Sequence, residues 1–166
     1  MHKKHNLTWT VGHSNSHEIK PKATVPATVP GAVQLDWANA HNWPPHYYSD
    51  NFKMFAWMED VYWTYSTTIN TPTPAHDQQI FLACKGVDYE YIVRLNGEII
   101  YEWEGMFTPF ELDLTHKLTE SSLLEIVIFP APKRPGAAIT RQQADQSCKL
   151  PCSYGWDWHP RLIPLG

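Results

Sequence analysis

The segment Tyr91-Ile92-Val93-Arg94-Leu95-Asn96-Gly97-Glu98-Ile99-Ile100-Tyr101 decides the fold class of this chain. Two runs of aromatic, β-branched and aliphatic residues flank Asn96-Gly97. This dipeptide is the strongest short-range signal for a two-residue hairpin, because both central positions need a positive φ. The segment therefore predicts two antiparallel strands joined by a tight turn.

Four further stretches have the composition and period of strands. In 61–69, large β-formers alternate with smaller or more polar neighbours, which indicates a strand with one buried face. The stretch 79–84 is more continuously apolar, so we expect it to be a central strand. The stretches 109–114 and 123–129 complete the set. Thr71-Pro72-Thr73-Pro74 is expected to end the first of these strands, because proline cannot donate to a ladder.

The spacing of these strands predicts an architecture. Short strands every 10 to 15 residues or so, without a sustained helical period, favour an all-β antiparallel sandwich of two sheets. Residues 20–60 and 130–155 are rich in Pro, Asn, His and Trp without clear periodicity, so we expect long loops lying across the sandwich. Loops of this length are usually functional or disordered, and their many Trp residues argue against disorder.

Charge and composition argue against several partners and cofactors. The net charge is −4, and the basic residues occur singly or in short pairs, so no nucleic-acid partner is predicted. No apolar run approaches the roughly 20 residues that a membrane span needs, and no membrane partner is predicted. The nine histidines are dispersed without the spacing of metal ligands. We therefore expect no metal and no other cofactor.

The three cysteines, Cys84, Cys148 and Cys152, cannot all pair within one chain. Cys148 and Cys152 could form a local bridge only if their segment curls, because an extended strand would hold them too far apart. We expect free thiols, with a bridge between these two as the alternative.

Four stretches of the sequence form a set when they are taken together in chain order: residues 27–36, 47–65, 86–115 and 154–162. They resemble motifs of the N-terminal sugar-binding domain of glycoside hydrolase family 2. The last stretch contains Tyr154-Gly155-Trp156-Asp157-Trp158-His159-Pro160, which is similar to the "FGWDWGP" signature of the β-mannosidase branch. This is the most specific of the four motifs.

The resemblance implies a jelly-roll sandwich, like the galactose-binding-like domains, that opens a multidomain enzyme. Members of this family are retaining β-glycosidases whose two catalytic Glu residues lie on a barrel of about 250 residues. We therefore expect residues 1–166 to be a single auxiliary domain of a larger enzyme, without catalytic residues and inactive alone. The implied partners are a β-linked glycoside and the downstream domains of the same chain. The first residues carry no apolar signal segment, and the resemblance is compatible with a periplasmic, secreted or lysosomal location.

The resemblance also assigns Trp156 and Asp157 to the substrate. In β-mannosidases this Trp-Asp pair reaches into the active-site pocket, where the Asp bonds sugar hydroxyls. A carboxylate can accept two such bonds, and an indole offers an apolar wall to the C–H face of a sugar ring. The alternative is that Trp156 and Trp158 pack under the last strand while Asp157 only holds a turn. Five other polar residues of the motifs are expected to be structural turn formers: Asp36, Asp50, Asn51, Asp88 and Asn96.

Two positions depart from the family pattern. Cys148 stands where the family usually has an Arg, and His159 replaces a glycine. Because Cys cannot reproduce the bidentate contacts of an Arg, a β-galactosidase parent stays an alternative to a β-mannosidase. Two other functions also stay open: an autonomous carbohydrate-binding module, and a purely structural sandwich that packs between domains.

Overall fold

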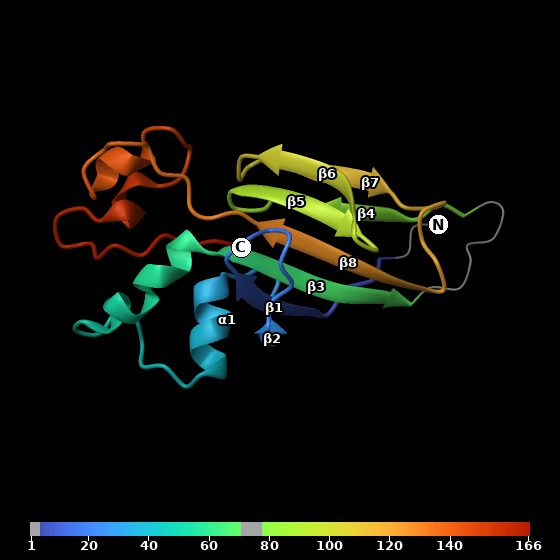
Figure 1. Ribbon diagram of the computed structural model, residues 1–166, viewed down its shortest axis with the longest axis horizontal. Coiled ribbons are helices and arrows are strands. Elements are labelled where there is room, and N and C mark those ends of the chain that lie inside the picture. The colour runs from blue at the N-terminus through green and yellow to red at the C-terminus, as the bar shows by residue number, and fades with distance from the viewer. Residues whose placement is uncertain (1–3, 71–77) are drawn as a thin grey trace.

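The computed structural model describes residues 4–70 and 78–166, and these are organised around antiparallel strands (Figure 1). The strands are β1 (Trp9–Ser14), β2 (Thr24–Ala27), β3 (Tyr62–Asn70), β4 (Phe81–Cys84), β5 (Glu90–Leu95), β6 (Glu98–Glu104), β7 (Phe110–Asp113) and β8 (Ser121–Ile128). The helical elements are α1 (Val33–Ala40) and three 3-10 helices, η1 (Asn51–Asp60), η2 (Arg141–Ala144) and η3 (Pro151–Tyr154). Each strand predicted from the sequence is present. The expected strand end at 71–74 lies outside the described residues.

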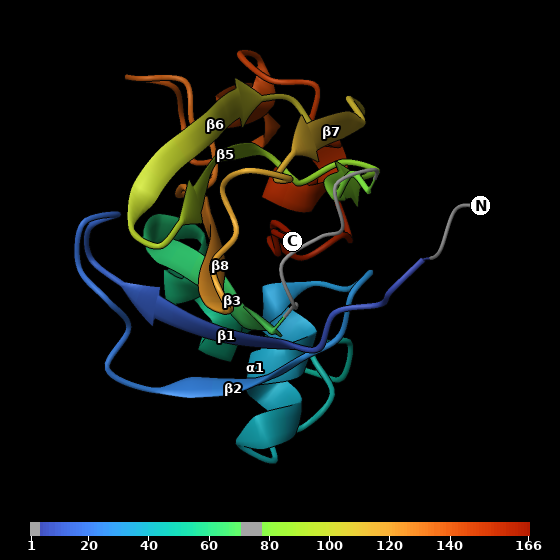
Figure 2. The same cartoon turned by 90° about the vertical axis from the view of Figure 1, so that its right-hand side faces the viewer.

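Two sheets form the sandwich. The larger has six strands in the order β2-β1-β3-β8-β5-β6, and the smaller pairs β4 with β7. All of these pairings are antiparallel. Figure 2 shows that the larger sheet is curved, with the smaller sheet, α1 and the C-terminus on its concave side. The predicted all-β sandwich is confirmed.

The β5–β6 hairpin forms where the sequence predicts it. Asn96 and Gly97 have φ values of 53° and 89° and connect the two strands. The Asn96 side chain also accepts a hydrogen bond from the backbone N–H of Leu123 at 2.9 Å. The turn is thereby attached to β8, the other neighbour of β5.

The expectation that 79–84 is a central strand is wrong. This stretch forms β4, which pairs only with β7 in the smaller sheet, and half of the Phe81 side chain is exposed. Burial alternates along β4, with Leu82 and Cys84 packed against the core and Phe81 and Ala83 exposed. A short apolar run does not by itself show whether one face or both faces of a strand are covered.

The expectation of a long loop over 20–60 is also wrong. This region contains β2, α1 and η1, which together occupy much of its length. Each element is short, and α1 buries polar residues such as Gln34 and Asp36 beside Trp37, so it has no clean apolar stripe. The region 130–155 is largely irregular, as expected, but it gathers at one end of the sandwich, near α1 and η1 (Figure 1).

The core lies between the larger sheet and the elements on its concave side. Trp63 of β3 is fully buried, and its indole N–H donates to the carbonyl of Met58 at 2.9 Å. The C-terminal residues join this core, because Ile163 and Leu165 are buried and both bond the Gln34 side chain of α1. All three cysteines are free thiols, as predicted. Within the described part of the chain, no helix has the length and apolar character needed to cross a bilayer.

Candidate functional site

The segment that contains Trp156 and Asp157 is a hairpin that projects from the core. Two hydrogen bonds between Trp156 and His159, of 3.1 and 2.8 Å, close a loop whose central residues are Asp157 and Trp158. Asp157 has a φ of 52°. A positive φ at the first central position alone is the φ pattern of a type II′ turn, which favours glycine there.

The side chains of this turn face solvent. Trp156 is 52% exposed and Trp158 is 85% exposed, and their rings stack with centroids 6.4 Å apart. The two indoles are therefore not packed under the last strand. Asp157 is exposed as well, and it forms no hydrogen bond or ion pair with any residue that the structure describes.

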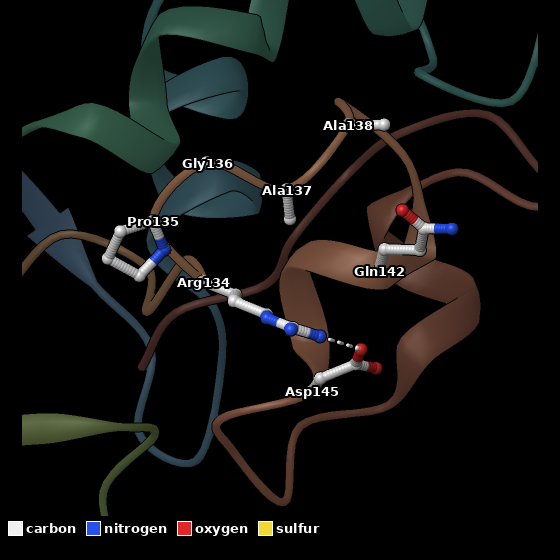
Figure 3. A pocket seen from close by; sticks show the side chains of 7 residues that line it. All are labelled: Arg134, Pro135, Gly136, Ala137, Ala138, Gln142 and Asp145. Atoms are coloured by element: carbon white, nitrogen blue, oxygen red, sulfur yellow. Dashed lines mark hydrogen bonds and ion pairs between the residues drawn. The ribbon is translucent and has the colours of Figure 1, made fainter.

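A polar pocket adjoins the turn. Its volume is about 340 Å³, and Arg134, Gln142, Asp145 and the loop 135–138 line it (Figure 3). Figure 3 shows the Arg134 guanidinium directed at the Asp145 carboxylate, 3.1 Å away. Gln142 follows Arg141, whose guanidinium lies over the Trp156 ring at 5.7 Å from the centroid. Gln143, on the other side of Gln142, accepts a hydrogen bond from Arg161 at 2.8 Å, so both neighbours of Gln142 contact the turn or its base. No sequence motif points to these pocket residues.

The base of the turn is held by a partly buried ion pair. Arg161 follows the turn, and its Nη2 atom lies 2.6 Å from an oxygen of Glu59, which is buried at the end of η1. The Arg161 Nη1 atom donates to the carbonyl of Tyr154 at 3.1 Å, on the other side of the turn. Tyr154 itself is fully buried, and its hydroxyl donates to the carbonyl of Pro132 at 2.6 Å. Burial raises the pKa of this hydroxyl to about 12, so it stays protonated as a donor.

A second buried pair lies near the C-terminus. The Lys149 ammonium lies 2.5 Å from an oxygen of Asp88. Burial raises the pKa of Asp88 and lowers that of Lys149, and in each case the partner charge opposes the shift. Asp88 lies in a bend between β4 and β5, where a turn residue was expected, and it is also half of an ion pair. Sequence alone offers no signal for this pair, because 61 positions separate the two residues.

The other predicted turn formers make local or structural contacts. Asp36 accepts a hydrogen bond from the Thr28 backbone N–H at 3.0 Å. Asp50 pairs with Lys53, and the Asn51 amide donates to the carbonyl of Pro45. Among the described residues, no group of three or more His, Cys, Asp or Glu side chains could hold a metal ion.

Comparison with known proteins identifies the domain. The model of the family described as the glycosyl hydrolase 2 galactose-binding domain-like family matches residues 9–166. The chain belongs to this family. Its match extends through the hairpin turn and the C-terminal residues that anchor it.

Several relatives of this family member are β-mannosidases. The chain is 28% identical to β-mannosidase B of Aspergillus clavatus, over 83% of the chain and 18% of that protein. It is 25% identical to the β-mannosidase of Bos taurus, over 93% of the chain and 20% of that protein. The chain thus spans about a fifth of the length of the curated relatives that it matches.

Solved structures show the same fold. The β-D-mannosidase of Dictyoglomus thermophilum matches with a TM-score of 0.72 and 25% identity, over 96% of this chain and 20% of that one. A β-glucuronidase of Faecalibacterium prausnitzii matches with a TM-score of 0.56 and 18% identity, over 98% of this chain and 30% of that one. The second likeness shows the fold alone. This family member is therefore a domain of the glycoside hydrolase family 2 type with a β-mannosidase-like fold.

Proposed function

We propose that this chain is the N-terminal sugar-binding domain of a retaining β-glycosidase of the β-mannosidase type, and that Trp156 and Asp157 complete the rim of its substrate pocket. Hydrolysis of the O-glycosidic bond is the work of two carboxylates on a catalytic barrel of about 250 residues, which is larger than this whole chain. The domain contributes substrate contacts and no catalytic group. Its partners are a β-linked glycoside and further domains of the same protein.

The proposal rests mainly on the contacts and backbone conformation of Asp157. An Asp that serves only a turn bonds its own backbone, but this carboxylate has no partner among the described residues. Its positive φ is uncommon for residues other than glycine, although Asp adopts it more readily than most. Such conformations cluster at functional sites, where the surrounding structure maintains them. An exposed carboxylate held in this way is free to accept two sugar hydroxyls.

The neighbours of Asp157 support the same role. The half-exposed Trp156 ring offers an apolar surface that suits the C–H face of a sugar. The nearby pocket adds the guanidinium of Arg134, the amide of Gln142 and the carboxylate of Asp145, which are donors and acceptors for hydroxyl groups. The β-mannosidase relatives make a β-mannoside the substrate to test first.

The experiment is to compare Asp157→Asn with the unmodified protein in the longer glycosidase. Asn keeps the shape and the tolerance of positive φ but removes the charge. Loss of a charge-assisted hydrogen bond costs about 1.5 to 3 kcal/mol, so kcat/KM for an aryl β-mannoside should fall by about 10- to 150-fold. Asp50→Asn is the control, because Asp50 is exposed and pairs with Lys53. An unchanged kcat/KM together with a clearly lower melting temperature would show instead that Asp157 stabilises the turn.

A second candidate, an autonomous carbohydrate-binding module, is favoured by the two exposed and stacked rings of Trp156 and Trp158. Stacked aromatic surfaces bind sugar rings without further domains. Titration of the 166-residue chain with manno-oligosaccharides separates the candidates. Saturable binding by the chain alone, lost in Trp158→Ala, favours the module.

A further inference from the structure

We infer that Glu59 and Arg161 act as positioning residues that fix the Trp156–Asp157 turn relative to the sandwich. The inference rests on the function proposed above. Neither residue is proposed to contact the sugar. Their proposed role is to hold the turn in a fixed position.

Arg161 joins both sides of the turn through one side chain. It lies two residues after His159, and its Nη1 atom donates to the carbonyl of Tyr154, which lies two residues before Trp156. The backbone N–H of Leu162 donates to the carbonyl of Ser153 at 2.9 Å, one residue pair further from the tip of the turn. The two ends of the hairpin are therefore held together at its base.

Glu59 connects this base to the sandwich. Its carboxylate accepts hydrogen bonds from Arg161 Nε at 3.0 Å and from Nη2 at 2.6 Å. A planar guanidinium bound through two nitrogens is fixed in orientation as well as in distance. The Glu59 carbonyl also accepts a bond from the Ala131 N–H at 2.8 Å, and β3 begins three residues later. The turn is thus attached to a strand inside the larger sheet.

The turn needs such an anchor because its own residues are exposed. Trp156, Asp157, Trp158 and His159 all face solvent, so little packing restrains them. A displacement of about 1 Å in a substrate-positioning group can cost about 100-fold in rate. Loss of the paired geometry at Arg161 should therefore reduce catalysis through the placement of Asp157.

The variant Arg161→Lys removes the planar guanidinium, which binds Glu59 through two nitrogens, and keeps the positive charge. The fold should survive, because Lys133 also lies 2.7 Å from a Glu59 oxygen and keeps this buried carboxylate paired. Arg94→Lys is the matched control, since Arg94 lies within β5, opposite Glu125 of β8, and has no part in the proposed site. If Arg161→Lys does not fold, Glu59→Gln serves in its place, because it keeps an acceptor opposite Arg161 without the charge.

The first measurement is backbone NMR relaxation on the 166-residue chain. Rigid backbone has an order parameter of about 0.85, and flexible backbone has one below about 0.6. We expect the order parameters of the Asp157 and Trp158 amides to be those of rigid backbone in the unmodified chain and in Arg94→Lys, and to fall towards the flexible value in Arg161→Lys. Order parameters that do not change in Arg161→Lys overturn the inference, whatever the enzymatic activity.

The second measurement is a double-mutant cycle in the longer glycosidase. Arg161→Lys should lower kcat/KM by about 10- to 100-fold. If Arg161 acts through the turn, the same change should have an effect of less than about twofold once Asp157→Asn is present. An equal loss in both backgrounds contradicts the inference. An Asp157→Asn variant with normal activity contradicts the proposed function, and the relaxation experiment then still decides the positioning role.

Discussion

The Nζ atom of Lys149 lies 2.5 Å from the Oδ1 atom of Asp88, and only 1% of the lysine side chain is exposed. The same ammonium donates to the carbonyl of Pro164 at 2.6 Å. The backbone of Asp88 pairs with Gly166 through bonds of 2.8 and 3.1 Å. The pair therefore joins the loop before β5 to both arms of the C-terminal segment that carries the turn.

Lys149→Met is expected to destabilise the chain by about 3 to 5 kcal/mol, because it leaves the Asp88 carboxylate without its cation. Burial opposes the charged form of each partner, as the directions of both pKa shifts indicate. The double variant Asp88→Asn/Lys149→Met should therefore recover much of the loss. Urea unfolding monitored by Trp fluorescence measures both values. A Lys149→Met chain as stable as the unmodified one would contradict this account of the pair.

His13 is expected to make the stability of the domain dependent on pH. Its ring lies among the indoles of Trp37, Trp57 and Trp63, with centroids 4.7 to 5.4 Å away. Burial, and then the neighbouring His41, lower the pKa of His13 from its ordinary value of 6.5. The folded chain thus binds fewer protons than the unfolded chain in this range, so the contribution of His13 is complete above pH 6.5 and is lost as the pH falls towards the folded pKa.

We therefore expect the free energy of unfolding to fall as the pH is lowered below 6.5, the ordinary pKa of the unfolded imidazole. His13→Gln should flatten this part of the profile. His17→Gln is the control, because His17 stacks on Phe129 outside the Trp cluster. Profiles of the same slope for His13→Gln and the unmodified chain would show that other groups cause the dependence.

Asp157→Gly tests whether the positive φ at Asp157 lowers the stability of the chain. With a φ of 52°, Asp157 occupies a region that glycine enters freely, that Asp and Asn tolerate, and that costs most other residues roughly 1 to 2 kcal/mol. The glycine variant should be as stable as the unmodified chain or more stable by up to about 1 kcal/mol, whereas Asp157→Ala should be less stable than the glycine variant. Thermal and urea unfolding of the three chains gives the comparison. A clear loss of stability in Asp157→Gly would mean that the Asp side chain itself holds the turn.

Features of the fold encoded by neighbouring residues could be predicted from the sequence. The hairpin at Asn96-Gly97 depends on backbone preferences of those two residues, and the strand at 61–69 depends on a local alternation, and both predictions are confirmed. The run at 79–84 was placed wrongly because the composition of a strand does not reveal its neighbours. The helix α1 was missed because its buried face mixes polar with apolar side chains, so the burial comes from tertiary contacts.

In the candidate site, too, some features could be predicted from the sequence and others could not. The sequence motif predicts that Trp156 and Asp157 contact the substrate. The structure adds that they lie on an exposed turn with a positive φ at Asp157. The pair Glu59–Arg161 could not be predicted, because 102 positions separate the residues. Charges are brought together by the path of the chain, and a single sequence carries no signal for that path between distant positions.

The most direct measurement is a crystal structure of the proposed parent glycosidase with a β-mannoside product or inhibitor in its pocket. We expect an oxygen of the Asp157 carboxylate to lie about 2.5 to 3.0 Å from a sugar hydroxyl, which is hydrogen-bond distance, with the Trp156 ring beside the sugar. A sugar bound in the pocket with Asp157 well outside hydrogen-bond distance, or with the Asp157 carboxylate paired to another protein group, would show that Asp157 does not bind the substrate.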